Sequence, residues 1–234
     1  MKPGIHLRRA LWSAIIFLAF IGVAVALRRM VHLLPVVVKG YHPPAATSNP
    51  VAARFAALDD LFARYPILTL VHIAPGLLFM MLGPLQFSST IRARHLRWHR
   101  WSGRIFVICG AIIGISALVM SFGMPAIGGF NQAAATILFA TFFLFAPCKA
   151  FWHIRRREIT LHREWMIRAF SVGLAVATIR PIIGMFFATS RFSGLTPYEF
   201  FGTGFWIGFL LHLIAAEAWI HATLPGERTV GFRE

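Results

Sequence analysis

The sequence predicts an all-α integral membrane protein, a bundle of about six transmembrane helices with both termini in the cytoplasm. Two observations predict this fold class. Hydrophobic residues make up 58% of the 234 residues and charged residues only 13%, about half the charged share of an average soluble domain. The basic residues, which give a net charge of +15, stand in short runs between apolar stretches. That pattern is typical of membrane-protein loops and argues against a nucleic-acid partner.

The apolar stretches have the length of membrane spans, which need about 20 residues as a helix. Because lipid offers the backbone no hydrogen-bond partner, each stretch is expected to be helical. The predicted spans are Leu11–Leu27, Pro66–Phe87, Gly103–Phe122, Gln132–Trp152, Trp165–Ala188 and Phe201–His221.

These spans divide the chain into four segments. Residues 1–27 form an N-terminal segment with the first transmembrane helix, and residues 28–65 form an extracytoplasmic loop. Residues 66–222 form a five-helix transmembrane core, and residues 223–234 form a cytoplasmic tail. Within the loop, an amphipathic piece near Val51–Arg64 is expected to lie on the membrane surface.

The orientation follows from the distribution of Lys and Arg, which favour cytoplasmic loops. Basic residues are concentrated at the N-terminus and after the second and fourth spans, and are nearly absent after the third and fifth. The first loop is an exception, but it is long and its charges are diluted. Its basic residues are Arg28, Arg29, Lys39, Arg54 and Arg64.

Four ionisable residues fall within the predicted spans, where such groups are costly and are candidates for function. His72 and Arg180 lie roughly 10 Å below the outer ends of their helices, and His212 lies near mid-membrane. Arg180 is expected to face water, freed backbone carbonyls or an anionic ligand. Glu217 lies in the inner part of the last span.

Depth also predicts a partner for Glu217. Arg168 and Arg104 lie at the same level by the rise of about 1.5 Å per residue. A structural ion pair is the expected role of Glu217, and a proton-carrying role is the alternative.

Histidines at the cytoplasmic ends of two helices predict a cofactor site. His99 and His162 stand just ahead of the lipid core, and such a pair can bind the iron of a b-type haem as axial ligands. Arginines beside them could bind the haem propionates: Arg100, Arg104 and Arg168 for an inner haem, Arg180 for an outer one. A divalent metal at the same histidines is the alternative. Gln86 is a further polar group at this level, and no motif for a catalytic residue is present.

Several short motifs resemble the family of bacterial membrane proteins catalogued as domain of unknown function 2306. The resemblance covers roughly residues 66–221 and implies a multi-pass protein of the bacterial cytoplasmic (inner) membrane. His72, His99 and His162 fit the family pattern, whereas an Asn is usual where His212 stands, which counts against His212 as a ligand. The motifs are Leu-Val-His72-Ile-Ala-Pro-Gly76, Gly83-Pro84-Leu85-Gln86-Phe87, His99-Arg100-Trp-Ser-Gly103-Arg104, His162-Arg163-Glu-Trp165-Met166-Ile167-Arg168 and Ala216-Glu217.

The family supplies no activity, but its size, helix count and histidine placement are similar to those of dihaem membrane cytochromes b. The leading hypothesis is therefore electron transfer by haem b, with His99 and His162 as axial ligands. One alternative is a non-catalytic subunit or assembly factor that binds a larger membrane complex or a second copy of the chain. Another is a small transporter in which Arg180 contacts an anion.

Overall fold

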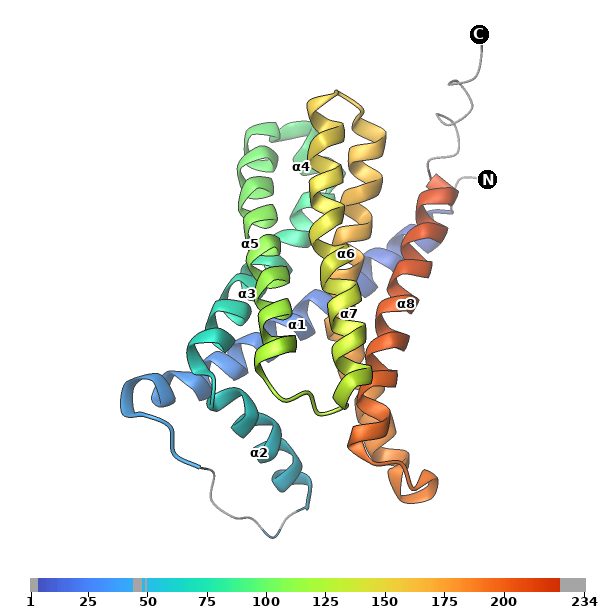
Figure 1. Ribbon diagram of the computed structural model, residues 1–234. Helices are drawn as coiled ribbons and strands as arrows, with labels where there is room; N and C mark the ends of the chain where they lie inside the picture. Colours follow the sequence, from blue (N-terminus) through green and yellow to red (C-terminus); the bar gives the residue numbers. More distant parts are fainter. Residues whose placement is uncertain (1–3, 44–47, 49, 224–234) are drawn as a thin grey trace. The chain divides into compact units, whose positions relative to one another are not determined.

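The structure, a computed structural model, describes residues 4–43, 48 and 50–223, and every regular element in these residues is an α-helix (Figure 1). Along the chain the helices are α1 (Ile5–Lys39), α2 (Pro50–Ala63), α3 (Pro66–Phe87), α4 (Ser89–Arg94), α5 (Leu96–Gly123), α6 (Gly129–Arg155), α7 (Ile159–Ser193) and α8 (Pro197–Thr223).

Six of these helices, α1, α3, α5, α6, α7 and α8, are long and apolar enough to cross a membrane. This finding confirms the predicted all-α membrane fold and the six spans. Most of the helices begin or end several residues outside the predicted spans, since the predictions followed only the apolar residues. The basic and histidine residues at the span ends, including His99 and His162, are helical as well.

The first helix does not end at Leu27 as predicted. α1 continues through Arg28 and Arg29 to Lys39, and it includes Pro35. The physical reason is that residues 30–38 remain largely apolar and contain no glycine. Gly40 follows the helix with a φ of +89°, a left-handed conformation that glycine adopts without the steric cost of a side chain. The predicted loop 28–65 therefore consists of the end of α1, a connection and α2, which confirms the helical piece near Val51–Arg64.

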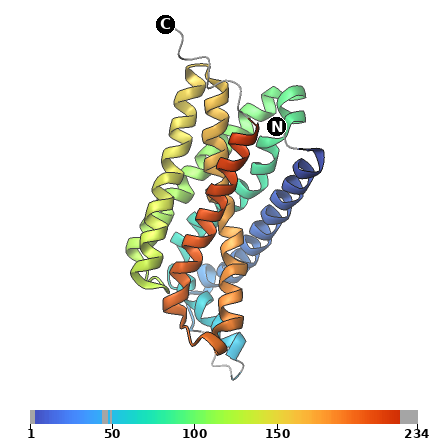
Figure 2. The ribbon, with the colours of Figure 1, turned by 90° about the vertical axis from the view of Figure 1, so that its right-hand side faces the viewer.

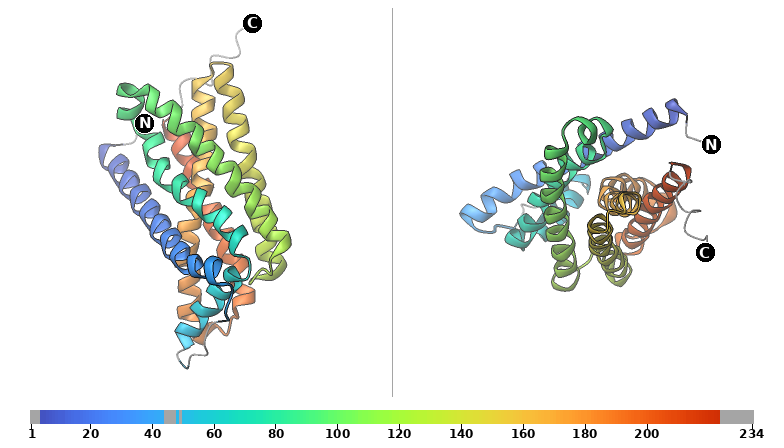
Figure 3. Two further views of the ribbon diagram at one scale, coloured as in Figure 1. Left: turned by 90° about the vertical axis from the view of Figure 1, so that its left-hand side faces the viewer. Right: turned by 90° about the horizontal axis from the view of Figure 1, so that it is seen from above.

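The chain divides into two compact units, residues 20–125 and residues 1–19 with 126–234. In the first unit α3 and α5 lie side by side along most of their length (Figure 3). The rings of Phe79 and Phe106 stack between them with centroids 4.2 Å apart. The short helix α4 connects the two, and Ser88 immediately before it is its N-cap: the Ser88 hydroxyl accepts a hydrogen bond from the Ile91 amide, an ordinary arrangement at a helix start.

In the second unit α6, α7 and α8 pack against one another in all three pairs, and the last two run side by side (Figure 2). Alanines that have no exposed surface let the backbones approach closely, as is usual where helices pack in membranes. These are Ala135, Ala146, Ala150, Ala169 and Ala175. Aromatic rings fill the wider gaps, such as Phe139 stacked on Phe209 at 4.5 Å.

The start of α6 touches α8 so closely that an alanine at Gly128 is expected to destabilise this unit. A Cβ there would lie 2.6 Å from the backbone nitrogen of Gly202 and 2.9 Å from the Cβ of Phe201. Since backbone cannot move aside cheaply, we expect Gly128→Ala to cost about 1–3 kcal/mol, the usual penalty of overpacking. Unfolding in detergent, followed by helix content, measures this.

Gly184 within α7 supplies the matched control, because a Cβ there meets nothing within 4 Å. Gly184→Ala is expected to leave the stability unchanged or to raise it by up to about 1 kcal/mol, since alanine favours the helix. Equal effects of the two substitutions would contradict the close approach of α6 and α8.

Candidate functional site

His162 lies in the first turns of α7 and is oriented by the end of α6. Its Nδ1 is 2.9 Å from the carbonyl oxygen of Ala150, and because a carbonyl can only accept, Nδ1 carries the proton and donates. In the neutral ring the lone pair is then on Nε2. Metal-binding histidines commonly have this arrangement, in which a hydrogen bond to the second nitrogen fixes the ring and its tautomer.

His153 of α6 stands one turn after Ala150, whose carbonyl accepts the hydrogen bond of His162. It is 7% exposed, and its Nδ1 lies 2.5 Å from a carboxylate oxygen of Glu158. The tight α6–α7 connection makes this contact possible, with Arg157 in a left-handed conformation at φ 62°. His153 was not predicted as a site residue, since its position in the sequence shows its depth but not which way its ring points.

Arg168 forms an ion pair with Glu217, which confirms the pairing predicted from their depth. Its Nε and Nη2 donate to the two carboxylate oxygens at 2.5 and 2.9 Å, a bidentate geometry typical of strong Arg–carboxylate pairs. Glu164, one turn earlier on α7, is 4% exposed and accepts a longer contact from Arg168 at 3.4 Å. One guanidinium therefore joins two carboxylates and links α7 to α8, an arrangement that gives Arg168 a structural role.

His212 is held against α7. Its Nε2 lies 2.8 Å from the hydroxyl of Thr178. With this partner the ring takes part in packing the α7–α8 interface.

In the unit of residues 20–125, His72 on α3 contacts α5. Its Nδ1 lies 2.9 Å from the hydroxyl of Ser116, and that hydroxyl donates to the carbonyl of Ile112 on its own helix. Ser116 therefore accepts a hydrogen bond from His72, so Nδ1 of His72 carries the proton. This joins the first third of α3 to the last third of α5.

Gln86 at the end of α3 is buried and sets the tautomer of His99. In the orientation that satisfies its neighbours, the amide nitrogen donates to Nδ1 and to the carbonyl oxygen of His99, each at 3.2 Å. The amide oxygen accepts from the backbone of Gly103 at 3.2 Å. Because Nδ1 of His99 accepts, its proton is on Nε2, the opposite arrangement to that of His162. Binding iron through Nε2 of His99 would require the Gln86 amide to turn over.

The remaining arginines predicted as propionate contacts have exposed side chains. Arg104 lies over the ring of Trp101 at 5.0 Å, a cation–π contact at the start of α5, and Arg100 is exposed on the same helix. Arg180 is exposed on α7 immediately before Pro181. Their predicted roles stay predictions.

Among the residues that the structure describes, no three of His, Cys, Asp and Glu lie close enough together to hold a metal ion. The divalent metal at the inner histidines stays a prediction. A haem, which needs only two protein ligands, is not tested by this observation.

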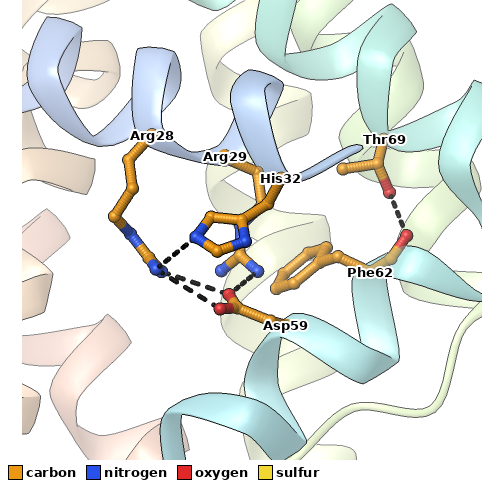
Figure 4. A network of polar contacts seen from close by, with 6 residues as sticks. All are labelled: Arg28, Arg29, His32, Asp59, Phe62 and Thr69. Atoms are coloured by element: carbon orange, nitrogen blue, oxygen red, sulfur yellow. Dashed lines mark hydrogen bonds and ion pairs between the residues drawn. The ribbon is translucent and has the colours of Figure 1, made fainter. Parts of the chain in front are cut away.

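A polar network that the sequence did not predict joins α1 to α2 (Figure 4). Asp59 of α2 forms ion pairs with Arg28 and with Arg29 of α1. The guanidinium of Arg29 lies over the ring of Phe62 at 4.4 Å, and the carbonyl of Phe62 accepts a hydrogen bond from Thr69 of α3 at 3.1 Å. The signal in the sequence was the pair of arginines at the end of an apolar run, opposite a short helix that contains two acids.

A second carboxylate of α2, Asp60, is engaged separately. It accepts hydrogen bonds from the hydroxyl of Tyr41 and from Nε of Arg64. The hydrogen bond from Tyr41 holds the pKa of Asp60 below its ordinary value, and the same contact raises the pKa of Tyr41. Asp60 therefore remains charged and bound to these two partners.

Comparison with known proteins gives one match. A family model described as a predicted membrane protein, domain of unknown function 2306, matches residues 69–220. No curated protein and no solved structure matches the chain.

Proposed function

From the premise that the chain belongs to the membrane protein family catalogued as domain of unknown function 2306, we propose that it is an electron-transfer protein of the bacterial cytoplasmic membrane that binds b-type haem, with His162 as an axial ligand. In this proposal both termini lie in the cytoplasm, as the Lys and Arg distribution predicts.

The observation that carries the proposal is the hydrogen bond from Nδ1 of His162 to the Ala150 carbonyl. It leaves Nε2 with the lone pair that an iron atom requires, and it fixes the ring through the backbone of a neighbouring helix. His162 is also partly buried at the end of an apolar helix. A haem bound there would supply a one-electron couple.

Other residues of the chain fit the proposal to different degrees. The second axial ligand predicted from the sequence, His99, requires a change in the orientation of the Gln86 amide. Arg100 and Arg104 are exposed cations that could bind propionates, whereas Arg168 is held by Glu217 and Glu164. The proposed propionate contacts therefore do not include Arg168.

A reduced-minus-oxidised visible spectrum of the purified protein tests this function. We expect a Soret band and the sharper visible bands of a six-coordinate b-type haem. A protein that is folded, as judged by its helix content, but colourless would overturn the proposal. If such a colourless protein copurified with a larger membrane complex, the non-catalytic subunit would become the better explanation.

Transport is a second candidate, favoured by a column of polar side chains along α7 and α8. It begins at Glu164, passes through the Arg168–Glu217 pair and continues to His212 and Thr178. By the helical rise, Glu164 and Thr178 are separated by roughly 21 Å. Ionisable and hydroxyl groups in such a column are the usual means of moving protons within a membrane.

Proton flux into proteoliposomes containing a pH-sensitive dye tests this second candidate. If the column conducts protons under an applied potential, Thr178→Val should slow the flux, because it removes the hydroxyl beside His212. Thr189→Val is the matched control, since that hydroxyl is exposed and bonds only to carbonyls of its own helix. A flux no greater than that of empty liposomes would exclude transport of protons.

A further inference from the structure

Two arginines of α1 share one carboxylate of α2. The guanidinium of Arg28 lies 3.1 and 3.3 Å from the two oxygens of Asp59, and Nη1 of Arg29 donates to the same Asp59 (Figure 4). One carboxylate balances one guanidinium. The cluster of Arg28, Arg29 and Asp59 therefore has one positive charge in excess.

No other acid within residues 20–125 is available to balance that charge. Asp59 and Asp60 are the only acidic residues in this stretch of the sequence. Asp60 is held by Tyr41 and by the exposed Arg64, whose guanidinium lies 2.9 Å from it. The excess charge must therefore be balanced by solvent ions or by an anionic ligand.

The two arginines differ in how accessible they are. The Arg29 side chain is only 8% exposed and lies over the ring of Phe62, so it is committed to Asp59. The Arg28 side chain is 45% exposed, and the exposed ring of His32, one turn along α1, lies 3.5 Å from its guanidinium. The excess charge is thus presented outward by Arg28 with His32 beside it.

Apolar side chains surround this exposed charge. Leu27, Val31 and Leu34 of the same helix are 47%, 66% and 54% exposed. The apolar run of α1 from Leu11 to Leu27 is roughly 25 Å long, close to the thickness of the hydrocarbon core. If this run spans the hydrocarbon core, Arg28, which immediately follows it, lies near the level of the phospholipid phosphates.

We infer that Arg28 and His32 bind the phosphate of an anionic phospholipid, while Arg29 and Asp59 hold the Arg28 guanidinium in place. Asp59 accepts one N–H from each Nη of Arg28, which leaves the other N–H groups of the guanidinium to donate to phosphate oxygens, and His32 supplies a further ring nitrogen. Inorganic phosphate offers the same oxygens, but only a lipid also covers the exposed Leu27, Val31 and Leu34 with its acyl chains.

The lipid site also gives a reason for an exception in the charge distribution. The segment after the apolar run of α1 is rich in arginine although the predicted orientation puts it outside the cytoplasm, where basic residues are usually few. Arg28 and His32 precede residues 69–220, which match the family model. The lipid site uses none of the residues proposed to bind haem and can be tested independently of them.

The test measures which lipid the protein retains. Full-length protein is reconstituted in nanodiscs of equal parts phosphatidylglycerol and phosphatidylcholine and is then exchanged into detergent. Native mass spectrometry counts the lipid molecules of each kind that remain bound to the protein. We expect the wild-type protein to retain more phosphatidylglycerol than phosphatidylcholine. In Arg28→Gln the ratio of retained phosphatidylglycerol to phosphatidylcholine should fall by about fivefold, the effect of one basic residue at a membrane surface. Arg28→Lys, which keeps the charge but loses the guanidinium, should keep only part of the wild-type preference.

Arg64→Gln is the matched control, because Arg64 is an exposed arginine of the same segment that is paired with Asp60, and it should retain the wild-type preference. An unchanged preference in Arg28→Gln, with native helix content, would overturn the inference. So would an equal loss in Arg64→Gln, which would indicate only a general attraction of basic residues to lipid. Displacement of the retained lipid by millimolar inorganic phosphate would indicate a phosphate site without lipid specificity, and would also overturn it.

Discussion

Replacing His162 with alanine is expected to remove haem from the purified protein. The substitution removes Nε2 of His162. The hydrogen bond from Nδ1 to the Ala150 carbonyl leaves the lone pair of the neutral ring on this Nε2. Loss of a supporting contact alone typically lowers metal affinity by 10–100-fold, so loss of the ligand should lower haem occupancy by more than about tenfold. The measurement is the Soret absorbance per protein, compared with wild type at equal helix content.

His95 supplies the control for this substitution. It is an exposed histidine at the junction of α4 and α5, and His95→Ala should bind haem as wild type does. Full Soret absorbance in His162→Ala would contradict the assignment of His162. If both His162→Ala and His99→Ala lost the haem, His99 would be the second ligand, and the Gln86 amide would have to accept from its Nδ1.

Replacing Arg168 with glutamine is expected to destabilise the protein by about 2 kcal/mol, between the cost of breaking an exposed ion pair and that of breaking a buried one, because the Glu217 side chain is 40% exposed whereas Glu164 is buried. The substitution removes a guanidinium that contacts both Glu217 and Glu164, and it does so between two packed helices, where water cannot easily replace it. The measurement is the free energy of unfolding in mixed detergent micelles, followed by helix content.

A double variant and a surface variant separate this effect from a general loss of packing. Arg168→Gln with Glu217→Gln should recover part of the loss, because the carboxylate is then no longer left without its partner. Arg64→Gln, which breaks an exposed i,i+4 pair with Asp60, should cost less than about 1 kcal/mol. A loss in Arg168→Gln no larger than in Arg64→Gln would show that the α7–α8 pair contributes little.

The depth of a residue along a membrane helix can be predicted from sequence, because the rise per residue is constant. The ion pair of Arg168 with Glu217 was predicted in this way, although the two residues are 49 positions apart. The same reasoning placed His99 and His162 at helix ends. It could not distinguish their tautomers, because these depend on a carbonyl of α6 for one ring and on an amide of α3 for the other.

Contacts that depend on the direction of a side chain around its helix were not predicted. His153 has the same depth as other inner histidines, and only the α6–α7 turn shows that it faces Glu158. Arg29 and Asp59 are 30 positions apart, and their pairing required α1 to continue past Leu27. The predicted end at Leu27 was wrong because Arg28 and Arg29 mark the end of the apolar run but not the end of the helix, which continues to Lys39.

By itself the sequence determined that this is a membrane protein of six apolar helices and which residues lie near the ends or the middle of each span. The physical reason is that lipid excludes unpaired backbone and charge, so length, hydropathy and depth suffice. The tertiary structure alone decided which polar groups meet: His162 with Ala150, His99 with Gln86, Arg28 and Arg29 with Asp59. These pairings depend on how each helix is rotated and on where the chain turns, and several residues far apart in the chain determine them together.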